Sequence, residues 1–245
     1  MIINKNILFH IIESNKTMLI IIFMFILNFF VPILNLYDYY FFDGFIWTLT
    51  LGEYSLILTI LLLISTYNVV SILSNYTELI LRFKTKEEYF KTLIKYVIII
   101  NLIVIILNYL LLTSSCLLFS NGVVIKDDYI NGTSNLYYMI WISVRQAIVL
   151  VLLSLVFLIV RISVKMPYNT IICLLFCIAI FIASYNDIIV TSLSKIFVFY
   201  YDYFRVHRYS SLLLEISCFT FYHCIYIFIL YIVYKIILKK TSIIS

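Results

Sequence analysis

Six long runs of apolar residues follow one another along the chain, separated by shorter polar segments. Their apolar positions are continuous, whereas the strands of a lipid-spanning barrel alternate between apolar and polar residues. Each run approaches or exceeds the length of about 20 residues that a helix needs to cross a bilayer. We therefore predict six transmembrane helices, over residues 17–37, 52–74, 93–115, 137–160, 169–186 and 212–238.

The composition supports a membrane protein. Hydrophobic residues make up 64% of the chain and charged residues 12%, and the mean hydropathy is +1.11. Soluble domains have roughly a quarter of their residues charged, so a water-soluble fold could not hide this much apolar surface. Four glycines and two prolines are too few for the turns of a many-stranded barrel. The predicted fold class is all-α, a polytopic membrane protein whose residues 1–245 form a single transmembrane domain.

Positive charge is unevenly distributed between the two sides of the predicted bundle. One side holds both termini and the loops 75–92 and 161–168, and with them most of the lysines and arginines. The other side has Lys126, Lys195, Arg205 and Arg208 between its spans. Because basic residues stay on the cytoplasmic side, we expect a multi-pass protein of the plasma membrane with both termini in the cytoplasm.

Three further segments have features of membrane interfaces. Residues 2–12 mix charged and apolar positions, which favours a short helix on the membrane surface. Residues 187–211 are rich in Tyr and Phe and lack Gly and Pro, which favours extracellular re-entrant or interfacial helices. The aromatic loop between the first two spans is expected to form an interfacial belt, with Asp38 and Asp43 facing water. Residues 116–136, with two Asn-Gly pairs, predict a polar hairpin.

The densest polar segment lies between the second and third spans, over residues 76–91. As a helix it would place Leu79, Phe83, Glu87 and Phe90 along one edge, with Lys84 and other charged residues pointing outward. A positively charged connector that merely sets the topology is one interpretation of this segment. The order of the residues in this segment supports a second interpretation.

That order resembles the cytoplasmic coupling helix of ABC type-2 transporter permeases, especially the small six-span members of low-GC bacteria. The family's loop typically has an acid, an aliphatic pair, Arg, an aromatic residue, a basic residue, Ser, charged residues, an aromatic pair and Lys. Thr85 stands where Ser is usual, and Tyr89 where Trp is common. The matching residues are Glu78, Ile80, Leu81, Arg82, Phe83, Lys84, Lys86, Tyr89, Phe90 and Lys91.

The resemblance implies the permease subunit of an ATP-driven ABC exporter, paired with a second, identical or paralogous, permease subunit. Its coupling helix would dock on a separate ATPase, which would bind ATP and Mg²⁺; no cofactor is expected on this chain, which has no Gly-x4-Gly-Lys-Ser/Thr loop. The implied substrate is an amphipathic or antimicrobial peptide, and no nucleic-acid partner is expected. The implied docking residues are Glu78, Arg82, Phe83, Lys84, Lys86, Glu87, Glu88, Tyr89 and Phe90.

A few polar residues lie inside the predicted spans. Arg145 and Gln146 are in the fourth span, and Arg145 has either a functional role, paired with Asp187 or Glu53, or a side chain that reaches the outer headgroups. Glu215 and His223 are in the sixth span, where we favour packing and interhelical hydrogen bonds over a proton relay. The asparagines of the spans are interpreted in the same way: Asn28, Asn68, Asn101 and Asn108.

The sequence does not favour an enzyme. Three histidines cannot assemble the His-Glu-x-x-His site of a metalloprotease. Cys173 and Cys177 are interpreted as small packing residues and not as metal ligands. Two other functions stay open: a non-transporting membrane immunity or scaffold protein that acts by binding, and, ranked third, a secondary transporter, which would require inverted repeats that the two halves do not display.

Overall fold

In the computed structural model of the chain, residues 11–35, 39–50, 52–75, 85–127, 133–185 and 212–240 are described. These residues form helices joined by loops, and no strand occurs among them. In chain order the helices are α2 (Asn15–Asn35), α3 (Phe41–Thr50), α4 (Gly52–Asn75), α6 (Lys86–Phe119), α7 (Asn135–Ser163), α8 (Tyr168–Tyr185) and α11 (Leu212–Lys240).

Each of the six predicted spans coincides with a long helix, and the prediction of an all-helical fold is confirmed for the described residues. Four helical stretches are long and apolar enough to cross a membrane: Leu56–Ser74, Glu87–Phe119, Asn135–Ser163 and Leu213–Lys239. In α2 and α8 the apolar helices found are shorter, Asn15–Phe30 and Tyr168–Ala179. That all six helices cross the membrane, with both termini in the cytoplasm, remains a prediction.

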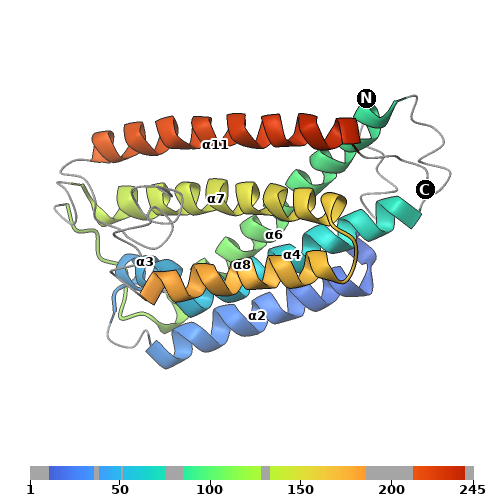
Figure 1. The fold of residues 1–245 in the computed structure, drawn as a ribbon. Coiled ribbons are helices and arrows are strands. Elements are labelled where there is room, and N and C mark those ends of the chain that lie inside the picture. Colours follow the sequence, from blue (N-terminus) through green and yellow to red (C-terminus); the bar gives the residue numbers. More distant parts are fainter. Residues whose placement is uncertain are drawn as a thin grey trace.

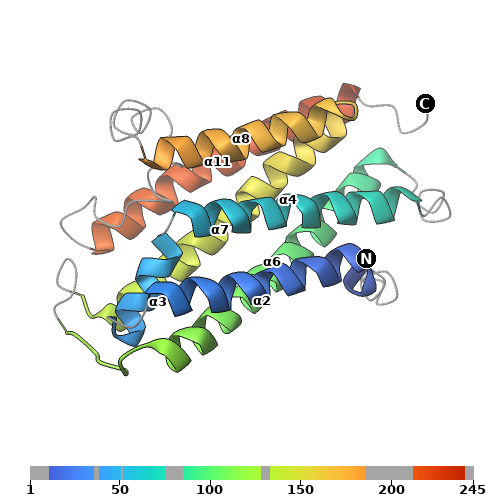
Figure 2. The ribbon, with the colours of Figure 1, turned by 90° about the horizontal axis from the view of Figure 1, so that it is seen from below.

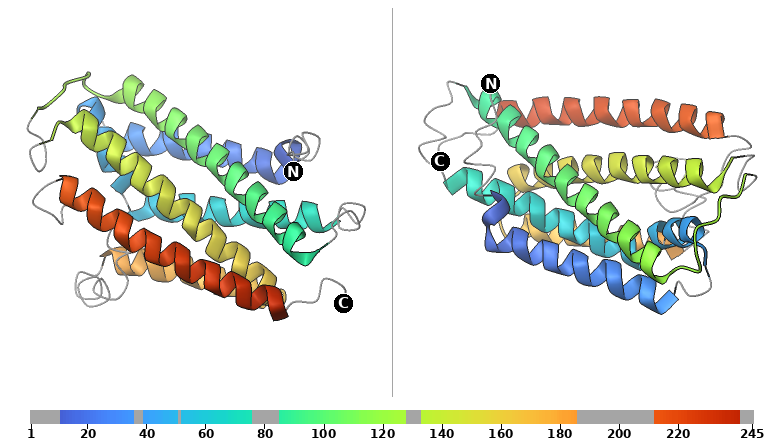
Figure 3. Two further views of the ribbon diagram at one scale, coloured as in Figure 1. Left: turned by 90° about the horizontal axis from the view of Figure 1, so that it is seen from above. Right: turned by 180° about the vertical axis from the view of Figure 1, so that it is seen from behind.

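The long helices run in alternating directions through one elongated bundle (Figure 1). The start of α2 and the end of α11 therefore lie at the same end, as the view from below also shows (Figure 2). Helices α4 and α7 are the central ones: α4 contacts α2, α3, α6, α7 and α8, and α7 contacts α3, α4, α6, α8 and α11. Helix α11 lies at the margin of the bundle and packs chiefly on α7 (Figure 3).

The segment between the first two long helices differs from its prediction. It is not an aromatic loop but the helix α3, in which Phe41, Phe42 and Phe45 are only 6%, 5% and 2% exposed. Asp43, expected to face water, forms an ion pair with Lys126, and its side chain is 12% exposed. The interpretation as an interfacial belt is wrong for these residues, because the apolar positions share one helix face that packs on α4, α6 and α7.

The start of α6 corrects the prediction of one helix over residues 76–91. Thr85 has an extended backbone (φ −139°, ψ 153°), and its hydroxyl oxygen accepts a hydrogen bond from the Glu88 backbone N–H at 3.2 Å. Thr-x-x-Glu is the pattern of a capping box, and acidic residues in a first turn favour the positive end of the helix dipole. Residues 86–91 are therefore the first turns of α6. Residues 76–84 lie outside the described residues, and with them Glu78, Arg82, Phe83 and Lys84.

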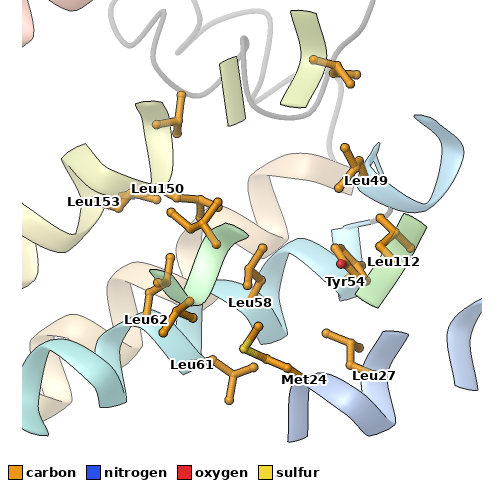
Figure 4. Close-up of a cluster of buried hydrophobic side chains, with 14 of the residues drawn as sticks. Met24, Leu27, Leu49, Tyr54, Leu58, Leu61, Leu62, Leu112, Leu150 and Leu153 are labelled. Carbon is orange, nitrogen blue, oxygen red and sulfur yellow. The ribbon is translucent and has the colours of Figure 1, made fainter. Parts of the chain in front are cut away.

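Two clusters of buried apolar side chains hold the bundle together. The larger joins α2, α3, α4, α6, α7 and α8, and takes one buried residue, Phe219, from α11. Figure 4 shows part of it, where Leu58 and Leu62 of α4 lie near Leu150 of α7. The smaller joins Ile11 to the ends of α4, α6 and α7 that lie on the same side of the bundle. Cys173 and Cys177 are buried in the larger cluster, so their predicted role as packing residues is confirmed.

The asparagines of the long helices form hydrogen bonds between helices, as predicted. Asn28 Nδ2 donates to Asn108 Oδ1 (2.8 Å), Asn108 Nδ2 donates to Tyr54 Oη (2.7 Å), and Tyr54 Oη donates to Asn28 Oδ1 (2.8 Å). This closed ring links α2, α6 and α4, and each member supplies a partner that an apolar environment otherwise lacks. Asn101 Nδ2 donates to Thr66 Oγ1 across α6 and α4.

Of the predicted polar hairpin over residues 116–136, residues 116–119 belong to α6, residues 135–136 belong to α7, and residues 128–132 lie outside the described residues. The described residues between the two helices include a turn that is held to α3 and α7 by hydrogen bonds. Gly122, in the first Asn-Gly pair, has φ 107°, a conformation that glycine adopts without steric cost. Its carbonyl accepts a hydrogen bond from the Phe41 backbone N–H at 2.9 Å, which attaches the turn to α3. Asn135, at the start of α7, donates to the Val124 carbonyl and accepts from the Lys126 backbone N–H. The segments 2–10 and 187–211, predicted to be surface and re-entrant helices, lie outside the described residues.

Candidate functional site

A buried ion pair connects α7 with the marginal helix α11. Arg145 Nη1 lies 2.9 Å from Glu215 Oε1, and both side chains are only 3% exposed. Removing two charges from water costs several kcal/mol per ion, and the attraction between them offsets this cost only when the geometry is good. The Arg145–Glu215 pair is thus an ionised group inside helices that are otherwise apolar. Because ionisable residues in such positions are commonly functional, we treat this pair as the candidate functional site.

The two helices bring the pair together through helical spacing. On α7, Arg145 follows Trp141 by four residues, so both side chains lie on the face turned toward α11. On α11, the buried side chains among those described are Glu215, Phe219 and His223, again spaced by four residues. The single buried stripe of α11 therefore contains both of its ionisable intramembrane candidates.

Glu215 receives two hydrogen bonds on one oxygen. Its Oε1 accepts from Arg145 Nη1 and from Trp141 Nε1, each at 2.9 Å. Its Oε2 is buried and has no hydrogen-bond partner in the described part of the chain. An unsatisfied buried acceptor costs about 1–3 kcal/mol. The site can therefore accept one more hydrogen bond from a donor or a cationic group.

Aromatic rings enclose the pair. Trp141 packs edge-on against Phe219, with ring centroids 5.3 Å apart. Phe219 stacks on the His223 ring at 3.7 Å, and His223 Nδ1 lies 2.8 Å from the Phe219 carbonyl oxygen. Rings of this size exclude water, which strengthens the electrostatic attraction within the pair. Packing, favoured from the sequence for His223, agrees with these contacts.

The partner of Arg145 differs from both residues considered in the sequence. Its side chain is paired with Glu215; of the two acids considered, Asp187 lies outside the described residues and the side chain of Glu53 is not described. Gln146, the neighbour of Arg145, turns to another face of α7. Its Oε1 accepts from Tyr109 Oη at 3.1 Å, and its Nε2 donates to the Leu49 carbonyl at 3.2 Å. Gln146 thus links α7 to α6 and α3 and does not belong to the ion pair.

A second charged cluster lies at the other end of α11. Glu87 Oε1, in the first turn of α6, lies 3.2 Å from Lys91 Nζ and 3.1 Å from Lys235 Nζ of α11. These side chains are between 39% and 66% exposed, so each contact contributes little stability by itself. Together they join the C-terminal part of the predicted coupling segment to the last turns of α11.

The remaining predicted docking residues have different environments. Phe90 is 6% exposed and packs in the smaller apolar cluster, so it faces the interior of this chain. Tyr89 is half-buried and contacts the Phe90 ring at 5.5 Å. Glu88 is exposed, while the side chain of Lys86 is not described. Among the predicted docking residues whose side chains are described, Glu88 is therefore exposed and Glu87 partly exposed, whereas Phe90 is buried.

Three residues of these clusters were not identified from the sequence: Trp141, Phe219 and Lys235. Trp141 could have been found from its spacing of four residues before Arg145. No local signal points from Lys235 to Glu87, because 148 residues separate them in the chain. Comparisons of the chain with protein-family models, with curated proteins and with solved structures find no match. The described residues contain no group of His, Cys, Asp and Glu side chains arranged to hold a metal ion.

Proposed function

We propose that the chain is the membrane-spanning permease subunit of an ATP-driven exporter, with six helices across the plasma membrane and both termini in the cytoplasm. A separate ATPase subunit docks on residues 76–91, and a second permease subunit completes the transporter. An amphipathic peptide is the proposed substrate. In this proposal the chain itself hydrolyses nothing; it converts movement of the ATPase into movement of its helices.

The observation that supports this function best is the position of Glu87. It belongs to the segment that resembles a coupling helix, it lies in the first turn of α6, and it contacts Lys235 near the end of α11. A rigid-body displacement of the segment would therefore act directly on two long helices. Thr85 caps α6, so the first turn of this helix is fixed and does not fray.

The buried pair gives the proposed movement a second fixed point. Because α11 is held to α7 at Arg145–Glu215 and to α6 at Glu87–Lys235, pulling on its cytoplasmic end would tilt it about the ion pair. Tilting of a marginal helix would open the side of the bundle toward the lipid. An amphipathic peptide, which partitions into membrane interfaces, would leave by such a lateral route.

The test is purification of the tagged chain from its native membranes in mild detergent, followed by mass spectrometry of associated proteins and an ATPase assay. We expect an ABC ATPase to be recovered with the chain. The variant Arg82→Ala/Lys84→Ala/Glu88→Ala should weaken its retention about thirtyfold, since truncation of hot-spot residues costs about 2 kcal/mol or more. Lys165→Ala, in another loop of the same predicted side, serves as the matched control.

The outcomes separate the proposal from its alternative. Undiminished ATPase retention in the triple variant would contradict the docking assignment. Absence of any ATPase from the wild-type preparation would overturn the exporter itself and leave a membrane protein that acts by binding, such as an immunity or scaffold protein.

A further inference from the structure

An apolar groove of about 330 Å³ lies between the first turns of α6 and the cytoplasm-proximal halves of α7 and α11. Figure 3 shows these three helix ends beside one another. Every wall of the groove is apolar apart from Lys91 and two tyrosines. The lining residues that matter here are Lys91 of α6, Leu155 and Ile159 of α7, and Tyr231 and Tyr234 of α11.

The lining of the groove favours an apolar ligand. Its volume is near the lower end of the range for ligand pockets, roughly 300–1,000 Å³. A hydrocarbon chain has no polar groups that need partners, and it matches the apolar walls.

The charges at the mouth of the groove select an anionic headgroup. Lys91 and Lys235 share a single carboxylate, that of Glu87, so one of the two ammonium charges is not neutralised there. Lys95 and Lys239, one turn further along α6 and α11, are exposed. Basic clusters beside membrane helices on the cytoplasmic side attract anionic lipid headgroups.

A third observation is a polar atom that lies within this region without a partner. The Oη of Tyr234 is buried and has no hydrogen-bond partner among the described residues, and Tyr234 lines the groove and the smaller cavity that continues it toward Leu238. A buried hydroxyl without a partner is unfavourable. A phosphate or ester oxygen of a bound lipid would accept its hydrogen bond.

We propose that this groove is a binding site for one molecule of an anionic phospholipid. One acyl chain lies between α7 and α11 against Leu155 and Ile159, and the phosphate lies at Lys91 and Lys235 with Tyr234 as a hydrogen-bond donor. The proposal requires that these helices lie in a membrane, and it does not depend on an ATPase. Lipid binding here would hold α11 to α7 at the end opposite to Arg145–Glu215.

The experiment is native mass spectrometry of the purified full chain after exchange into detergent with phosphatidylglycerol and phosphatidylcholine of identical acyl chains. We expect one phosphatidylglycerol to be retained in preference to phosphatidylcholine. Lys91→Gln and Lys235→Gln should each reduce that preference about fivefold, since each basic residue near an anionic lipid contributes about 1 kcal/mol, which is about fivefold in affinity. Lys16→Gln, at an exposed lysine of α2, a helix that contributes no residue to the lining of the groove, should leave the preference unchanged.

Filling the groove provides an independent arm. Leu155→Trp should abolish retention of the lipid, whereas Leu175→Trp, on the exposed face of α8, should not. If Leu155→Trp does not yield a folded chain, Tyr234→Phe replaces it, because this change conserves the packing and removes the hydroxyl group. Tyr234→Phe should weaken phosphatidylglycerol binding. Equal retention of the two lipids, or full retention in the lysine and groove variants, would overturn the proposal. Recovery of a peptide or a second copy in place of the lipid would overturn it as well.

Discussion

Arg145 and Glu215 lie in helices that are otherwise apolar along most of their length. Each would be costly alone, because an unpaired buried charge has neither water nor a counter-ion. Trp141 adds an N–H donor to the same carboxylate oxygen, so three side chains depend on one another. The stability that each contributes is therefore visible only when the partners are changed together.

We predict that Glu215→Gln destabilises the chain by about 3–5 kcal/mol, because it leaves the Arg145 charge buried without its counter-ion. The double variant Arg145→Met/Glu215→Gln should recover most of this loss, since the charge is then gone and the Gln oxygen can still accept from Trp141. Unfolding by heat or denaturant in detergent micelles measures both effects. Glu13→Gln, at an exposed position, is the control and should change stability by less than about 0.5 kcal/mol. A double variant as unstable as the single one would contradict this account.

At the scale of elements, α3 is the part of the fold that the sequence pattern predicted least well. Its aromatic residues and its Asp43-Gly44 pair are typical of a loop at a membrane surface. The structure instead buries one face of a ten-residue helix against α4, α6 and α7, and the Gly122 turn attaches to its first residue. Aromatic side chains serve both environments, so composition alone does not distinguish them.

We expect Phe45→Ala to cost about 3–5 kcal/mol, as truncation of a fully packed aromatic side chain does. Tyr40→Ala, at an exposed position directly before α3, should cost less than about 1 kcal/mol. The same unfolding measurement compares the two variants. If both variants lose a similarly small amount of stability, the measurement would contradict the packing of α3 and favour a belt at the membrane surface.

The long helices could be predicted because each is one unbroken apolar run, a signal that depends only on neighbouring residues. Contacts between runs could not be predicted in the same way. Arg145 was recognised as a candidate, but its partner lies 70 residues away, and no pattern within either helix joins them. The start of α6 after Thr85 could have been predicted in part, because Thr-x-x-Glu is a capping pattern. The periodicity of the residues on both sides of Thr85 nevertheless suggested one continuous helix.

At the scale of the whole molecule, the alternation of six long helices places the Gly122 turn and the α7–α8 connection at opposite ends of the bundle (Figure 1). The excess of basic residues at the second end predicts that it faces the cytoplasm. Short connections between antiparallel neighbours are typical of such bundles.

A cysteine placed at either end reports the orientation. In a background without native cysteines, we expect Val123→Cys to react with a membrane-impermeant maleimide on intact cells. Met166→Cys should react only after the membrane is opened. Both native side chains are exposed, at 58% and 57%, so neither change disturbs the core. Labelling of both positions from outside, or of Met166→Cys alone, would contradict the predicted topology.

The slight attachment of α11 has a consequence for the order in which the molecule is assembled. The larger apolar cluster takes only Phe219 from this helix, and most of its described surface, including Leu213, Phe221 and Phe228, is exposed. Helix α11 is also synthesised after the others, and membrane helices insert before they associate. The earlier helices can therefore complete their core while the C-terminal segment is still on the ribosome. The last helix then docks as a separate step, with the Arg145–Glu215 pair setting its register.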